Sequence, residues 1–412
     1  MKGNNNIIRE LLDKGVKISC PESVEIGRDI DPRRISGENV TIHGGCRIHG
    51  PKTLIMPGVK LGYEAPVTLK NCRLGPKVEL KGGVFYDSCF LDRVTIGSGA
   101  QIREACLLEE GVRLAHTVGL KHTILFPFLT LGSLINFCDC LMAGGTDEKN
   151  HSEVGSSFVH FNYTPNQDKA TASLIGDVPK GVMLNQPPIF LGGQGGIVGP
   201  VRVEYGTVVA AGTILRKDVL KGGTIILGYP ALSRSITFHP GLYTNVRRII
   251  ELNSLYIANI IALRRWYLDI RYRIVDKDPM EKDLLDGAID VINKAIAERL
   301  KRLRDVANQM PRSIEIYQKI GSKSGKTIQT KQKFFKTWPD MERVFNDSLN
   351  LEGNGPKKEN FIRVIEDTVK KEGKDYIRVI KGLARDEAGI GTGWLQGLVD
   401  EIMAHVFSLM KR

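Results

Sequence analysis

The chain lacks a long apolar run. Its 412 residues contain no stretch of eighteen consecutive apolar side chains, and the nearest candidate, LYIANIIALRRWYL, includes Arg264 and Arg265. A helix that crosses a bilayer needs about 20 mostly apolar residues. The first residues, MKGNNNIIRELLDKG, also lack the apolar centre of a secretion signal. We therefore expect a cytoplasmic protein that does not span a membrane.

Cysteine is missing after residue 140. Cys46, Cys72 and Cys89 stand where neighbouring stretches of the same pattern carry valine. A free cysteine behaves as a small apolar side chain, so these three are expected in the core rather than in disulfides. Cys138 and Cys140 are separated by one residue, which does not match the usual spacing of zinc ligands, and no metal is expected.

A short apolar repeat dominates the first half of the chain. From Val40 onward a small or β-branched residue, a spacer and an aliphatic residue recur about every six positions, as in VTI, CRI, VKL, VTL, CRL and VEL. This period fits neither a long strand nor a helix and matches the hexapeptide repeat of a parallel β-helix. With three repeats per turn, roughly ten coils fit between residues 20 and 235. An antiparallel β-sandwich, the alternative, would need longer alternating runs and hairpin turns.

The composition changes near Pro240. Beyond it, apolar residues recur at helical spacing in NVRRIIELNSLYIANIIALRRWYLDIRYRIV and in two later stretches. We therefore predict a helical lead-in at 1–19, a β-helix at 20–237 and an α-helical domain at 238–412. Residues 241–412 carry +8 of the formal net charge of +12. The apolar stripe from Val246 to Ile270 could also form a helical contact between subunits.

One polar stretch, HFNYTPNQDKA at 160–170, interrupts the repeat. An interrupted solenoid often carries its binding face at the interruption, whereas a polar loop that only caps the wall is the structural alternative. LGGQGG at 191–196 does not open a helix and has no nucleotide-binding lysine, so it is expected to be a tight turn that lets backbone approach a ligand.

Four motifs carry a family resemblance. They are Asn162-Tyr163, Lys169, Ile175-Gly176-Asp177 and Ala210-Ala211-Gly212-Thr213. Together they resemble the left-handed β-helix acetyltransferase half of the bifunctional N-acetylglucosamine-1-phosphate uridyltransferases. The resemblance is close over about 60 residues, is only periodic over the preceding 120 or so, and does not extend to the helical tail.

The resemblance implies a left-handed β-helix, a homotrimer with sites between subunits, and acetyl-coenzyme A as donor. It implies that Asn162 and Tyr163 contact the substrate or the donor's pantetheine, and that Lys169 meets a sugar phosphate. An asparagine offers sugar hydroxyls both a donor and an acceptor, and a lysine meets phosphate as a point charge. The residues expected along the donor groove are Ala211, Gly212, Arg216 and Lys217.

Three departures from the family pattern affect the chemistry. Asn136 and Phe137 stand where the family has its catalytic histidine. An extra segment, GVMLNQPPIFLGGQGG, separates Asp177 from Pro200. The N-terminal part also shows no glycine-rich nucleotide loop followed by basic residues, so uridylyl transfer is disfavoured.

Another base is therefore required. Acyl transfer needs a group that titrates near neutral pH within reach of the acceptor. His151 lies in GGTDEKNHSEVG, a polar segment with three acidic residues, one of which could fix its tautomer. We predict His151 as the base, with His160 and His116 in reserve.

The segment 313–338 holds six lysines and one glutamate, and it ends in Phe334, Phe335 and Trp338. This pattern suits nucleic acid or an anionic membrane surface, although a solvated helix face and linker is the favoured interpretation.

The sequence as a whole favours an acyltransferase-like protein that transfers acetyl to a sugar nucleotide or an amino-sugar phosphate. A non-catalytic sugar-nucleotide-binding or scaffold protein is the alternative. A relative of the UDP-N-acetylglucosamine pyrophosphorylases is the third possibility, because the bifunctional family also carries that name.

Overall fold

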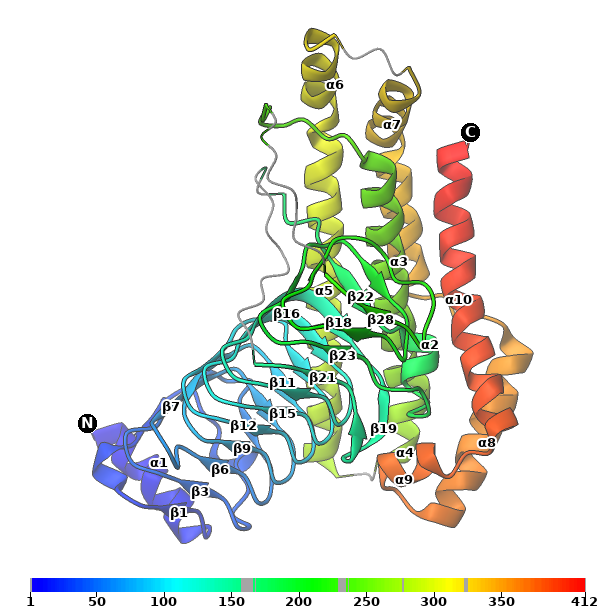
Figure 1. Ribbon diagram of the computed structural model, residues 1–412. Helices are drawn as coiled ribbons and strands as arrows, with labels where there is room; N and C mark the ends of the chain where they lie inside the picture. The colour runs from blue at the N-terminus through cyan, green and yellow to red at the C-terminus, as the bar shows by residue number, and fades with distance from the viewer. Residues whose placement is uncertain are drawn as a thin grey trace.

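The molecule is a long β-solenoid with helices packed along one side (Figure 1). The structure, a computed structural model, describes residues 2–156, 166, 168–228, 235, 237–275, 278–321 and 325–411. The chain starts with α1 (Lys2–Asp13) at one end of the solenoid, and two short 3-10 turns, η1 (Pro21–Ser23) and η2 (Pro32–Arg34), lie in the first coils.

The first face of the solenoid is a parallel sheet of eleven strands. Its strands are β1 (Lys17–Ile18), β3 (Thr41–Ile42), β6 (Lys60–Leu61), β9 (Glu79–Leu80), β12 (Thr95–Ile96), β15 (Arg113–Leu114), β17 (Thr130–Leu131), β21 (Glu153–Val154), β23 (Phe190–Leu191), β26 (Val208–Val209) and β28 (Ile225–Ile226). One strand per coil gives about eleven coils, close to the predicted number.

The second face starts with β2 (Glu25–Ile26), β4 (Arg47–His49), β7 (Val67–Lys70), β10 (Gly83–Tyr86) and β13 (Ala100–Ile102). The first halves of two longer strands, β16 (Gly119–Leu125) and β18 (Asn136–Met142), continue it. A separate pair, β24 (Gly196–Ile197) and β27 (Ile214–Leu215), forms its far end.

The third face is formed by β5 (Leu54–Ile55), β8 (Arg73–Leu74), β11 (Cys89–Phe90), β14 (Leu107–Leu108), the second halves of β16 and β18, β22 (Ser173–Ile175) and β25 (Arg202–Val203). A short antiparallel hairpin, β19 (Gly145–Asp147) and β20 (Asn150–His151), follows β18, and α2 (Val178–Gly181) follows β22.

Each short strand points one apolar side chain of the repeat into the core. Ile42, Leu61 and Leu80 occupy equivalent positions of neighbouring coils and are fully buried, while the residue before each is polar and faces outward. Cys46 and Cys72 are equally buried, which confirms their prediction as core residues. The predicted β-solenoid followed by a helical C-terminal region is confirmed.

Between the second and third faces the chain turns through left-handed backbone. The non-glycine residues with positive φ at this turn, which we call the second corner, are Asn71, Asp87, Ala105, His122 and Asp139. Because every coil needs the same conformation here, the positive φ belongs to the turn and is not by itself a sign of function.

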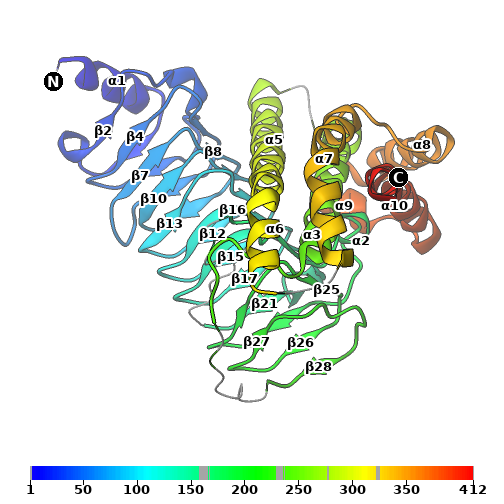
Figure 2. The same cartoon turned by 90° about the horizontal axis from the view of Figure 1, so that it is seen from above.

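The helical region comprises α3 (Val246–Trp266), a π-helical turn η3 (Tyr267–Arg271), α4 (Tyr272–Ile274), α5 (Pro279–Asn308), α6 (Met310–Lys319), α7 (Gly325–Ser348), α8 (Gly355–Glu372), α9 (Tyr376–Lys381) and α10 (Arg385–Lys411). Helix α5 lies along the third face against β5, β8, β11 and β14, and α3 contacts β22 (Figure 2). Within the described ranges, none of the helices combines the length and apolar character that a membrane span requires.

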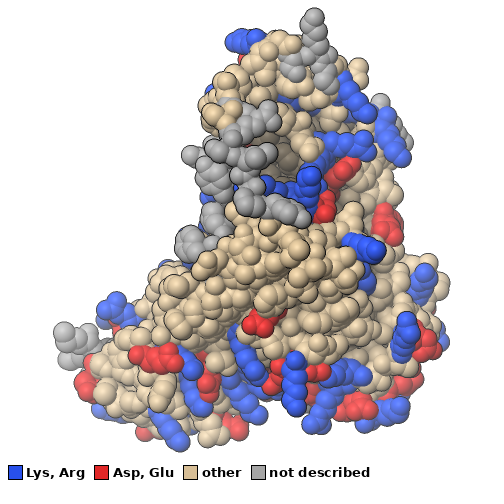
Figure 3. All heavy atoms as spheres, viewed as in Figure 1, with Lys and Arg blue, Asp and Glu red and all other residues tan. Residues whose placement is uncertain are grey.

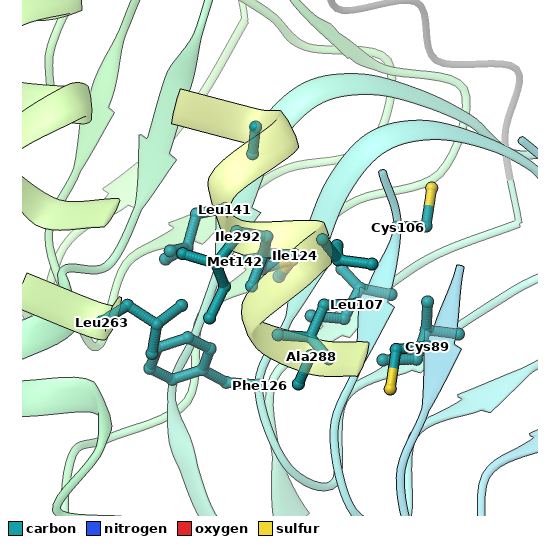
Figure 4. Packing of buried hydrophobic residues seen from close by; sticks show 14 of the residues in the cluster. Cys89, Cys106, Leu107, Ile124, Phe126, Leu141, Met142, Leu263, Ala288 and Ile292 are labelled. Atoms are coloured by element: carbon teal, nitrogen blue, oxygen red, sulfur yellow. The ribbon is translucent and has the colours of Figure 1, made fainter. Parts of the chain in front are cut away.

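The core of the β-helix and the core of the helices are continuous. Ala288 and Ile292 of α5 meet Leu107 and Ile124 of the third face (Figure 4). Burying one such isoleucine or leucine stabilises the fold by about 1.5–3 kcal/mol relative to leaving it exposed.

The apolar stripe from Val246 to Ile270 is used inside the chain. Ile257, Ile260 and Ile261 of α3 are fully buried, because α3 packs against α2, β22, α5, α7 and α10. The expectation that this stripe forms a contact between subunits was wrong, since helical periodicity reveals an apolar face without revealing which partner covers it.

The aromatic residues near 313–338 are mostly part of the helical core. Phe334 and Trp338 are buried, and the ammonium of Lys331 donates to the Ser313 carbonyl oxygen at 3.3 Å. Phe335 alone of the three aromatics is exposed. Two of the three rings are thus unavailable for stacking on nucleic-acid bases.

Ion pairs tie α5 to the β-helix along its length. Asp283 pairs with Arg34 and Arg73 at 2.5 and 3.2 Å near the start of α5. Arg299 pairs with Asp139 at 2.6 Å near the end of α5, and both side chains are buried.

A second buried cluster joins the β-helix to η3. The guanidinium of Arg271 donates to both carboxylate oxygens of Glu110 at 2.5 and 2.9 Å and lies 3.4 Å from Glu109. The Tyr267 hydroxyl donates to Glu109 at 2.5 Å. Burial, opposed by Arg271, raises the pKa of Glu109 to about 7. The junction therefore depends on one arginine that compensates two buried carboxylates.

Candidate functional site

Between Val154 and Ser173, the described residues form no strand of the second face. First-face strand β21 ends at Val154, and third-face strand β22 begins at Ser173. Among the described residues of this coil no strand continues the second face, so the first half of β18 is the edge of the described strands. The predicted substrate residues Asn162 and Tyr163, and the reserve base His160, lie outside the described residues.

On this edge, Asn136 and Phe137 stand where the resembled family has its catalytic histidine, and neither side chain is a base. Phe137 points into the core and is fully buried, whereas Asn136 is partly exposed on the outer surface. An amide does not accept a proton near neutral pH. Asn136 borders a hollow of about 370 Å³ on the second face, together with Gln101 and Arg103.

Cys138 is the next outward residue of the same strand. Burial raises the pKa of its thiol to about 11, against the opposing charges of Arg103, Lys121 and Lys169. A thiol with so high a pKa is protonated at neutral pH, and the thiolate is the nucleophilic form. Cys138 is therefore a poor nucleophile, and the three cations around it make the edge attractive to anions.

A histidine–carboxylate pair lies at the second corner, one coil from this edge. His122 Nδ1 is 3.0 Å from Asp139 Oδ1, and the imidazole is 12% exposed. Arg299 of α5 binds the same carboxylate oxygen at 2.6 Å. A carboxylate that holds Nδ1–H fixes the tautomer and leaves Nε2 as the nitrogen that can take a proton. His122 was not among the residues predicted from the sequence.

The imidazole of His122 borders a hollow of about 570 Å³ between the second corner and α5. Its charged lining residues are Asp87, Glu104, Lys121, Lys294, Glu298, Lys301 and Arg302. Figure 3 shows that side chains of both signs lie close together on the surface above the solenoid. Three of the hollow's four cations are paired with its three carboxylates, Lys121 with Glu104, Lys294 with Asp87 and Arg302 with Glu298. With Arg103 and Lys169 beside Cys138, a small positive excess remains that suits a phosphorylated ligand.

Lys169 stands at the return of the chain to the third face. Its side chain is exposed, its backbone has φ +54°, and its carbonyl oxygen accepts from Arg299 at 3.0 Å. Because Arg299 binds both Asp139 and the Lys169 carbonyl, the structure brings Lys169 and the His122 pair to one corner.

The structure does not bring His151 to this corner. His151 lies on the hairpin that follows the end of the third-face strand β18, whereas Lys169 precedes β22 at the beginning of that face. Its Nδ1 is 2.9 Å from the Glu148 carbonyl oxygen, so backbone rather than an acidic side chain orients the ring. The other reserve, His116, is exposed, with Nδ1 3.2 Å from Ser133 Oγ.

The residues predicted for the donor groove flank strand β27. Ala211 and Gly212 form the turn before it, and Arg216 and Lys217 follow it as exposed side chains. In the coil below, Gly192 packs so closely that a Cβ there would lie 2.3 Å from the Ala211 nitrogen. The glycines of LGGQGG thus allow two coils to stack closely. The sequence alone could not distinguish this structural role from a close approach of the backbone to a ligand.

The described residues contain no group of three or more histidine, cysteine, aspartate or glutamate side chains arranged to hold a metal ion.

The chain is similar to the bifunctional protein GlmU of several bacteria. It is 29% identical to GlmU of Pelobacter propionicus over 229 residues, which cover 55% of this chain and 44% of the relative. It is 26% identical to GlmU of Thermotoga petrophila over 220 residues, 52% and 42% of the two chains. The chain thus spans less than half the length of these relatives, and the resemblance to hexapeptide-repeat acyltransferases is confirmed.

No protein-family model matches the chain. The solved structure of LpxA from Acinetobacter baumannii aligns over 68% of this chain and 95% of its own, at 15% identity and a TM-score of 0.22. These last values are too low to support a structural argument.

Proposed function

We propose that the protein is a hexapeptide-repeat acyltransferase that moves an acetyl group from acetyl-coenzyme A to an amino-sugar phosphate or sugar nucleotide. The observation that carries the proposal is the His122–Asp139 pair in a hollow lined by four cations and three carboxylates beside the interrupted coil. The similarity to GlmU supports the reaction class. A cytoplasmic location remains part of the proposal.

The proposed chemistry assigns one role to each group. His122 Nε2 removes a proton from the acceptor amine or hydroxyl as it attacks the thioester carbonyl, and coenzyme A leaves as the thiol. Asp139 holds the imidazole and stabilises its protonated form. Lys169 binds the phosphate of the acceptor, with Asn162 and Tyr163 as proposed sugar or pantetheine contacts.

The donor would lie along the last coils, beside Ala211, Gly212, Arg216 and Lys217. The two exposed cations suit the phosphates of coenzyme A. His151 is retained as the competing proposal for the base, because its Nδ1 contact also leaves Nε2 available.

A non-catalytic sugar-nucleotide-binding protein is the second candidate. It is favoured by Asn136, the partly exposed residue at the position of the family's base, whose amide does not accept a proton near neutral pH. The deciding experiment mixes the protein with acetyl-coenzyme A and glucosamine 1-phosphate and follows release of free thiol. Thiol release supports the enzyme, whereas calorimetric binding of UDP-N-acetylglucosamine without thiol release supports the binding protein.

Lys169→Ala is expected to weaken binding of glucosamine 1-phosphate by about 1–3 kcal/mol, the cost of losing a charge-assisted hydrogen bond. The melting temperature without ligand should barely change, because the side chain is exposed. Calorimetry and thermal melting measure the two quantities. Lys60→Ala, on the first face, is the matched control and should leave affinity unchanged. Equal affinity in the Lys169 variant would remove this residue from the site.

Self-association is expected to use the outer surface of the last coils. Phe190, Val208 and Ile225 are paired neighbours on the first face, and all three are exposed apolar side chains. We propose a homotrimer that buries this ladder. The double change Val208→Asp with Ile225→Asp should convert trimer to monomer in analytical ultracentrifugation at micromolar concentration. A monomeric parent protein under these conditions would contradict the trimer.

A further inference from the structure

The segment that returns the chain to the third face, of which residues 166 and 168–170 are described, is held by the helical region. Its described residues all receive a hydrogen bond from residues 75 to 130 positions later in the chain. The bonds are Gly241 N to Asn166 Oδ1 at 2.9 Å, Tyr243 Oη to Asp168 Oδ2 at 2.7 Å, Arg299 Nη1 to Lys169 O at 3.0 Å and Asn253 Nδ2 to Ala170 O at 3.1 Å. The polar residues of this segment that looked like ligand contacts are therefore partly anchors.

The donors of these bonds are themselves fixed. The Tyr243 backbone nitrogen donates to the buried Ser313 Oγ at 2.9 Å, and burial together with Asp168 raises the pKa of the Tyr243 hydroxyl, which stays protonated. Asn253 also donates to the Ile249 carbonyl oxygen at 2.8 Å within α3. Rigid donors give the segment one defined position.

Lys169 needs such support. Its φ of +54° lies in the left-handed region, where a non-glycine residue is held only when its surroundings determine its conformation. The direction of the side chain follows from this backbone. Arg299 contacts both the Lys169 carbonyl oxygen and Asp139, so one side chain of α5 links the proposed phosphate-binding residue to the carboxylate that orients His122.

We propose that the helical region is a positioning element of the site, in which Tyr243 and Arg299 set the place of the Lys169 ammonium relative to His122. The proposal rests on the proposed function, in which Lys169 binds the phosphate of the acceptor.

Tyr243→Phe tests the proposal with the smallest change, the loss of one hydroxyl. The dissociation constant for glucosamine 1-phosphate should rise about tenfold, because the lost bond goes to a charged partner. In a turnover assay KM should rise while kcat stays nearly constant, since no group at the reacting atoms changes. Tyr272→Phe is the matched control: it removes a tyrosine–aspartate bond, to Asp286, elsewhere in the helical region. It should leave affinity unchanged.

A double variant separates positioning from general stability. In the Lys169→Ala background, Tyr243→Phe should have no further effect on affinity, because the residue it positions is gone. Additive effects of the two changes would overturn the positioning role while leaving the proposed function intact. Unchanged affinity in Lys169→Ala alone would remove Lys169 from the site and overturn the positioning role, whereas the thiol-release assay tests the proposed function separately.

Discussion

His122→Gln is expected to lower acetyl transfer by at least about a hundredfold, the usual contribution of a positioned general base. Glutamine retains a polar side chain near Asp139 but cannot take a proton from the acceptor. Binding of glucosamine 1-phosphate, followed by calorimetry, should change little.

The comparison variant is His151→Gln, which decides between the two proposed bases. A large loss of turnover there, with full activity in His122→Gln, would move the base to the β19–β20 hairpin. That hairpin is held by exposed ion pairs, Arg113 with Glu148 at 2.6 Å and Lys381 with Asp147 at 3.7 Å, which contribute little rigidity. The more buried setting of His122 is the better one for an oriented base.

Arg271→Met is expected to cost about 3–5 kcal/mol in the free energy of unfolding, since it leaves two buried carboxylates without their cation. The measurement is urea unfolding at neutral pH. Arg273→Met is the matched control two residues away, where a partly exposed pair with Glu366 at 3.0 Å is lost. Its cost should stay below about 1 kcal/mol. Equal losses in both variants would show that the junction does not depend on Arg271.

The pH dependence of the same junction has a defined sign. Burial raises the pKa of Glu109 from 4.5 to about 7 in the folded protein. The folded state therefore binds the proton more tightly, and this group's contribution to stability is present below about pH 4.5 and is lost as the pH rises through about 7. Urea midpoints measured from pH 5 to 8 should show a steeper fall in Arg271→Met than in the parent protein.

Local patterns were sufficient to predict the solenoid. A repeat of six fixes which residue of each strand points inward, and this placed Ile42, Leu61 and the buried cysteines in the core. The same pattern located the polar interruption at 160–170, and the residues described between Val154 and Ser173 form no second-face strand. These features depend on neighbours in the chain, which a sequence displays directly.

Contacts across the chain were not visible in the same way. Arg299 reaches Asp139 from 160 positions away, and no periodic pattern signals that meeting. The pairing of His122 with Asp139 had a signal that was missed. The two residues are 17 positions apart, the length of one coil here, so stacking places one above the other. Counting by coil length would have found the pair.

The length of helix α5 also matches the length of the stretch of solenoid that it covers. From Asp283 to Arg299 it rises about 24 Å at 1.5 Å per residue, while the four coil steps from Arg73 to Asp139 span about 19 Å at 4.8 Å each. The two lengths agree within the reach of a side chain, which lets both terminal ion pairs form. Solenoids change length readily by gaining or losing whole coils. Here one added coil would separate the residues of one terminal ion pair between α5 and the solenoid. This stretch of the solenoid is therefore fixed at its present number of turns.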